Sequence, residues 1–147
     1  MKRSRMAFLF LLIFVMTGCG DNDNWIEAEE EFEEVESFML EYMEAWKGSI
    51  ENQSFSVMEK YFVPNSTVYH MQRRQHQEMV SSRKKEEFID SENETLEKNQ
   101  YDEYKFTWKE HIKMYEGDSA EEQARTRSYY LSRLRGALKI TVIERKD

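Results

Sequence analysis

Glu110 is an ionisable residue on the apolar side of an alternating stretch of the sequence. From residue 104 to residue 114, apolar and polar side chains alternate, which is typical of a half-buried antiparallel strand. Burial among apolar groups raises the pKa of a carboxylic acid, so that it can exchange a proton near neutral pH. The residues that share this side of the predicted strand include Tyr104, Phe106, Trp108 and Glu110.

A structural interpretation of Glu110 is favoured over a catalytic one. No second titratable residue accompanies it on that side of the strand, and a lone carboxylate usually pairs with Arg or Lys or reaches water. We therefore expect no catalytic residue in the chain, and we expect Glu110→Gln to leave folding nearly unchanged. An enzyme or a small-molecule-binding domain that uses the cavity around Glu110 is the alternative.

Arginine residues gather in a later hairpin and could bind a polyanion. Tyr129 shares the face of Arg125 and Arg127 if the strand is regular, and Arg with Tyr can hold an anionic polymer through charge-assisted hydrogen bonds and stacking. Cross-strand pairing of these arginines with Glu and Asp is the favoured alternative. The candidate polyanion-binding residues are Arg125, Arg127, Tyr129, Arg133 and Arg135.

The histidines do not have the spacing of metal ligands. His70 and His76 are six residues apart, whereas ligands on one helix face are three or four apart. His111 alternates with lysines on a polar strand face. We therefore expect these side chains at the surface, with no metal site, and the sequence indicates no cofactor because it lacks a glycine-rich phosphate loop.

The N-terminal residues have the pattern of a secretory signal. An apolar run at residues 6–16 follows a basic start and is too short to span a bilayer, which needs about 20 apolar residues. The run ends in Met16-Thr17-Gly18-Cys19, which is similar to the lipobox of bacterial lipoproteins, where two small residues precede the cysteine that becomes lipidated.

That similarity implies a diacylglyceryl thioether on Cys19, the only cysteine of the chain. The expected division is a signal peptide at 1–18, a lipidated Cys and polar tether at 19–26, and a single domain at 27–147. The expected location is the extracytoplasmic face of the cell membrane, held by the lipid anchor. An uncleaved signal anchor with an incidental cysteine is the alternative.

The composition sets the class of the remaining chain. Its 147 residues fit one domain, and 39% hydrophobic residues are too many for a disordered protein. A formal net charge of −8 argues against nucleic acid as a partner, because phosphate binding needs a basic surface.

Helical periodicity marks the first half of the domain. Apolar residues recur every three or four positions from 27 to 47, a helix expected to end near Gly48. A short helical pattern follows at 55–62, and Ser66 is expected to cap a third helix that runs toward Ser81.

Strand periodicity marks the second half. Residues 88–96 form a weak strand candidate, and clearer strands are expected at 104–114, 124–134 and 137–143, with turns at Glu116-Gly117-Asp118 and Arg135-Gly136. The predicted class is α+β, with N-terminal helices packed on a curved antiparallel sheet of about four strands.

Aromatic positions carry a resemblance to a known family. The segments at 38–46, 55–61, 64–69, 129–131 and 138–143 resemble the C-terminal domain of the TcaA family, Gram-positive membrane proteins linked to teicoplanin sensitivity and cell-wall stress. The resemblance implies a cone-shaped fold like that of nuclear transport factor 2, often with a pocket between sheet and helices. The candidate pocket residues are Tyr104, Phe106, Trp108 and Glu110. TcaA proteins also carry a zinc ribbon and an internal membrane helix, and this chain offers neither pattern.

The expected function is that of a lipid-anchored, non-catalytic interaction module at the Gram-positive cell envelope, in cell-wall stress or the antibiotic response. Its expected partners are the membrane, through the anchor, and an envelope protein or an anionic wall polymer. By analogy with this fold, a homodimer could form through the exposed sheet face.

Overall fold

The computed structural model describes residues 23–146. The predicted position of the lipidated Cys19 and the signal peptide therefore lie outside the described residues. Four helix and strand segments, β1 (Ile26–Glu27), α1 (Phe32–Glu51), η1 (Phe55–Tyr61) and α2 (Thr67–Ser81), precede the main strands. The main strands are β2 (Lys84–Lys98), β3 (Tyr104–Glu116), β4 (Ser119–Leu134) and β5 (Ala137–Lys146).

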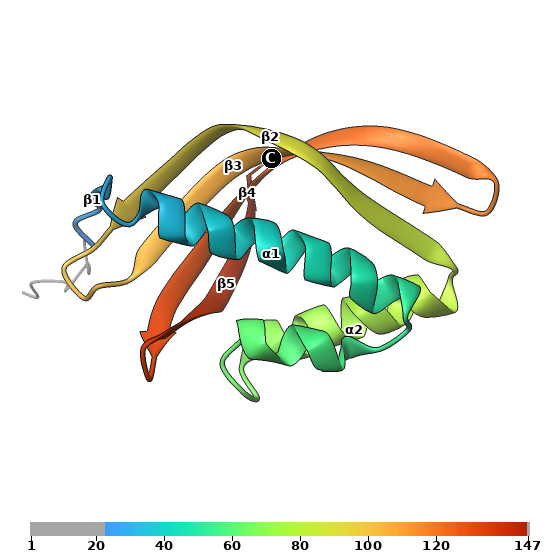
Figure 1. Ribbon diagram of the computed structural model, residues 1–147, viewed down its shortest axis with the longest axis horizontal. Coiled ribbons are helices and arrows are strands. Elements are labelled where there is room, and N and C mark those ends of the chain that lie inside the picture. Colours follow the sequence, from blue (N-terminus) through green and yellow to red (C-terminus); the bar gives the residue numbers. More distant parts are fainter. Residues whose placement is uncertain (1–22, 147) are drawn as a thin grey trace, which may run out of the picture.

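The strands form one antiparallel meander in the order β1-β2-β3-β4-β5. The sheet curves over α1, and α2 lies below α1 (Figure 1). This arrangement confirms the prediction of an α+β fold with helices on a curved antiparallel sheet. The described residues contain five strands rather than about four, because the short β1 adds an edge strand to β2.

Strand β1 also lies partly within the expected tether. Ile26 pairs with Lys98, and the backbone N–H of Asn24 donates to Gln100 Oε1 at 3.0 Å. The ring of Trp25 packs edge-on against Tyr130, with centroids 5.8 Å apart. The segment before residue 27 therefore already contacts the sheet.

Helix α1 buries the predicted apolar stripe but is displaced along the chain. It begins five residues later than expected, because β1 and a turn occupy the preceding residues, and it continues through Gly48 to Glu51. Ile50 is buried, so the packing extends beyond the glycine. The helix ends where Gln53 takes a φ of 53° and Ser54 N–H donates to Ser49 O. Its buried residues are Val35, Met39, Tyr42, Met43, Trp46, Ser49 and Ile50.

The weak strand pattern before residue 98 comes from a long, irregular strand. β2 has 15 residues, but its pairing with β3 shifts between Phe88 and Asp90 and again between Glu92 and Thr95. Asn93 takes a φ of 59° within the second shift. Each bulge interrupts the alternation of inward and outward side chains along the strand. Apolar and polar residues therefore do not alternate in this part of the sequence.

The predicted cap of α2 is confirmed. Ser66 has an extended backbone, and its side-chain oxygen accepts from the Tyr69 backbone N–H at 3.3 Å. A serine cap satisfies one of the free N–H groups of the first helical turn.

Replacing Ser66 with alanine is expected to lower the free energy of unfolding by about 1 kcal/mol, because Tyr69 N–H loses its acceptor. Denaturant titration of the purified protein measures this change. Ser81→Ala, in the last turn of the same helix, is the matched control and should change stability by no more than about 0.5 kcal/mol. Equal losses in the two variants would contradict the capping role.

Candidate functional site

The residues of the predicted pocket lie together on the inner face of β3. Tyr104, Phe106, Trp108 and Glu110 are all buried, and Glu110 is fully enclosed. The Trp108 ring stacks on Phe88, with centroids 5.2 Å apart, and meets Phe106 edge-on at 5.0 Å. These aromatic side chains pack against one another and form the core beneath the sheet.

Both oxygens of Glu110 are occupied by neighbouring side chains. Oε2 accepts from Arg125 Nε at 2.6 Å. Oε1 accepts from Trp108 Nε1 at 2.9 Å and from the Tyr129 hydroxyl. Glu110 and Arg125 are cross-strand partners in the β3–β4 register, which explains why residues fifteen positions apart meet. The geometry matches the ion-pair interpretation of Glu110.

Arg125 joins Glu110 to a second buried carboxylate. Its Nη2 lies 2.6 Å from Glu86 Oε1, and its Nη1 lies 3.2 Å from Glu86 Oε2. Burial acts to lower the pKa of Arg125, but the hydrogen bonds and charges of Glu86 and Glu110 outweigh it and raise that pKa. We call Glu86, Arg125 and Glu110 the buried ion-pair cluster.

The tyrosines beside this cluster remain neutral. Burial raises the pKa of Tyr129 well above its ordinary value, and the negative charge of Glu110 acts in the same direction. Burial likewise raises the pKa of Tyr42, whereas the charge of Arg127 lowers it. Tyr129 can therefore donate its proton to Glu110 in a hydrogen bond but does not lose it at physiological pH.

The structure does not bring the candidate polyanion-binding residues onto one surface. Arg125 and Tyr129 point into the core, where Tyr129 has no exposed area. Arg133 makes two hydrogen bonds to Glu34 on α1, at 2.9 and 2.6 Å. Arg135 is exposed in the β4–β5 turn, where its φ is 53°. A regular strand turns alternate residues inward, so the shared face noticed in the sequence is the inner face.

Arg127 lines a cavity of about 430 Å³ between α2 and β5. We call this space the α2–β5 cavity. Its lining includes apolar residues and the amides of Gln72 and Gln75 on α2. Arg127 and Arg145 are cross-strand partners in the β4–β5 register. Among the lining residues, the sequence had indicated only Arg127 as a site residue, because helix and strand periodicity do not show which faces meet.

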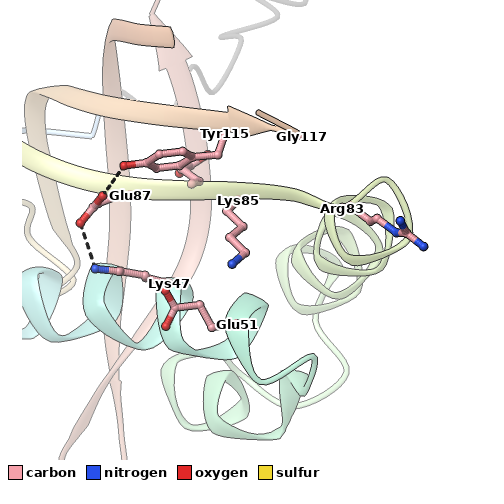
Figure 2. Close-up of a pocket in the computed structure, with 8 residues that line it drawn as sticks. Lys47, Glu51, Arg83, Lys85, Glu87, Tyr115 and Gly117 are labelled. Atoms are coloured by element: carbon pink, nitrogen blue, oxygen red, sulfur yellow. Dashed lines mark hydrogen bonds and ion pairs between the residues drawn. The ribbon is translucent and has the colours of Figure 1, made fainter. Parts of the chain in front are cut away.

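A second cavity, of about 360 Å³, lies where the end of α1 meets β2 and β3. Figure 2 shows Lys47 and Tyr115 pointing at Glu87 from opposite sides, and Arg83 pointing away. Lys47 Nζ and the Tyr115 hydroxyl each lie 2.9 Å from a Glu87 oxygen. The Lys47 hydrogen bond, followed by that from Tyr115, lowers the pKa of Glu87. The carboxylate is therefore already paired.

One histidine is misplaced by the sequence interpretation. His76 is buried, and its Nε2 lies 3.0 Å from the carbonyl oxygen of Ser49. Its ring meets Trp46 and Phe55 edge-on. His76 therefore joins α2 to α1, and the expectation that all histidines lie at the surface is wrong for this one.

Within residues 23–146, no group of three His, Cys, Asp or Glu residues is arranged to hold a metal ion. The helices of the same region are too short or too polar to cross a membrane.

A comparison with family models matches residues 31–144 to the family described as the TcaA protein NTF2-like domain. The match covers α1 to most of β5. A comparison with curated proteins found no match.

Proposed function

Because the chain belongs to the family of TcaA NTF2-like domains, we propose that it is a lipid-anchored, non-catalytic interaction module on the outer face of the cell membrane. It would present its domain to an envelope protein in the response to cell-wall stress. The family match is the observation that carries this proposal, since TcaA proteins belong to the Gram-positive envelope.

The anchor is supported by the sequence around Cys19, in which a basic start and a short apolar run precede two small residues and the cysteine. Contacts with the sheet begin at Asn24 and Trp25. An extended chain spans about 3.5 Å per residue, so an acylated Cys19 would hold the domain within roughly 20 Å of the membrane surface.

A non-catalytic role is supported by the burial and the hydrogen bonds of Glu110. Its two oxygens accept three hydrogen bonds, from Arg125, Trp108 and Tyr129. A general acid or base must reach a substrate within hydrogen-bond distance. Glu110 is fully buried and both of its oxygens already accept hydrogen bonds. The geometry therefore gives no support to the alternative in which this residue is catalytic.

Replacing Cys19 with alanine is expected to release the protein from membranes or to leave an unprocessed precursor, because no sulfur remains to carry the lipid. A diacylglyceryl group anchors firmly, since each buried methylene contributes about 0.8 kcal/mol. Fractionation and immunoblotting of cells measure the membrane-bound share. Thr17→Ala keeps a small residue at its position and should behave as wild type. Normal processing and membrane retention of Cys19→Ala would contradict lipidation.

Crosslinking in intact cells, followed by mass spectrometry of the captured species, tests the interaction itself. The proposal predicts a discrete envelope protein among the products of the wild-type chain, and a strongly reduced yield for Cys19→Ala. Capture of the same protein at equal yield by both variants would contradict a role for the anchor. An absence of any discrete product would contradict the interaction module.

A further inference from the structure

The α2–β5 cavity contains a largely buried guanidinium group. Arg127 is only 7% exposed, and its Nε has no hydrogen-bond partner in the part of the chain that the structure describes. The arginines beside it on β4 are different, because Arg125 pairs with Glu86 and Glu110, and Arg133 pairs with Glu34. A buried N–H donor without an acceptor is costly, and more so when its group is charged.

A second guanidinium group, that of Arg145, adds to the positive charge at this cavity. Arg145 lies directly across from Arg127 in the β4–β5 register and lines the same cavity. Like charges that face each other across two strands destabilise the sheet. A negatively charged group in the cavity between β5 and α2 would therefore stabilise both arginines.

The remaining walls define the rest of the ligand. Val68 and Ile143 supply apolar surface, and Met71 and Val142, also in the lining, are about half exposed. Gln72 already accepts from the Tyr42 hydroxyl at 3.4 Å and lies 3.5 Å from Gln75. The cavity thus combines two guanidinium groups, buried Arg127 and exposed Arg145, with apolar side chains, the arrangement of a site for a molecule with one polar end.

We propose that the α2–β5 cavity binds a small amphipathic carboxylate, with its anionic group at Arg127 and Arg145 and its apolar part against Met71 and Val142. Arginine donors match the two oxygens of a carboxylate. A volume of about 430 Å³ lies in the range of small-molecule sites, about 300–1,000 Å³. Binding at this cavity does not depend on membrane attachment, so it can fail without contradicting the proposed function.

Calorimetric titration of the full chain in a neutral detergent with hexanoate tests the proposal. Wild type should bind hexanoate saturably, with hexan-1-ol at least tenfold weaker because it lacks the charge. Inorganic phosphate should also bind at least tenfold more weakly, because it lacks the apolar part. Tighter binding of phosphate than of hexanoate, or equal binding of hexan-1-ol, would overturn the carboxylate assignment.

Two variants locate the site. Arg127→Met should weaken hexanoate binding at least tenfold while the thermal midpoint stays unchanged or rises, because a buried donor without an acceptor is replaced by an apolar chain. Met71→Glu should weaken binding at least tenfold by placing a carboxylate on the exposed rim. Gln77→Glu, an exposed position of the same helix, adds the same charge away from the lining and should bind as wild type.

Hexanoate binding that is unchanged in both Arg127→Met and Met71→Glu would overturn the assignment of the cavity. If Arg127→Met lowers the thermal midpoint strongly, the guanidinium has a structural role, and hexanoate binding that is unchanged in Met71→Glu then overturns the assignment. The Met71→Glu variant keeps the binding test valid even in that case, because Met71 is exposed.

Discussion

Replacing Arg125 with methionine is expected to lower the free energy of unfolding by about 4 kcal/mol. The guanidinium is the cation between Glu86 and Glu110, which are 6% and 0% exposed. The methionine side chain replaces the apolar part of arginine but carries no charge, so both carboxylates stay buried without a counter-charge. Removing one partner of a buried ion pair costs about 3–5 kcal/mol for this reason. Denaturant titration followed by circular dichroism measures the loss.

Arg74→Met is the matched control for this variant. Arg74 is exposed on α2, so the same substitution should change stability by no more than about 0.5 kcal/mol there. The double variant Arg125→Met with Glu110→Gln has one unpaired buried carboxylate fewer than Arg125→Met alone. Its loss of stability should therefore be about 1–3 kcal/mol smaller than the sum of the two single-variant losses. Additive losses would contradict direct pairing of Arg125 with Glu110.

Replacing Glu110 with glutamine is expected to lower the free energy of unfolding by about 2–3 kcal/mol. The glutamine amide has one acceptor oxygen, whereas three donors converge on Glu110, from Arg125, Trp108 and Tyr129. Its NH2 group must face at least one of those donors. A buried donor left without an acceptor costs about 1–3 kcal/mol, and more when it is charged. The sequence alone suggested almost no effect, because the partners were not visible in it.

The same titration measures the Glu110→Gln loss, with Glu121→Gln as its control. Glu121 is exposed near the start of β4, so removal of its charge should be nearly neutral. If Glu110→Gln and Glu121→Gln have the same stability within about 0.5 kcal/mol, the buried ion-pair cluster does not stabilise the fold, and its assignment is wrong.

Local periodicity was sufficient to predict much of the fold. The stripe from Val35 to Trp46 and the alternation along β3 each require a buried face, and the structure buries those faces. The Ser66 cap and the Arg135-Gly136 turn follow from backbone geometry that a few residue types satisfy, and both are present.

Features that depend on pairing between distant segments were not predictable. β1 has two residues and is a strand only because β2 lies beside it. The bulges of β2 remove its alternation, and the burial of His76 depends on where α2 meets α1. The arginine face of β4 was noticed, but whether that face points to solvent or to the core depends on the sheet as a whole.

The candidate cavity shows the same limit. Arg127 and Arg145 are eighteen positions apart and meet through the β4–β5 register, while Gln72 and Met71 come from a helix of the first half of the domain. Strand alternation could have placed Arg127 and Arg145 on one face, had the register been known.

The most direct test of the account is the intact mass of the protein purified from native membranes. The account predicts a chain that begins at Cys19 and carries a thioether-linked diacylglyceryl group. A chain that retains residue 1, or one with an unmodified thiol at Cys19, would contradict it.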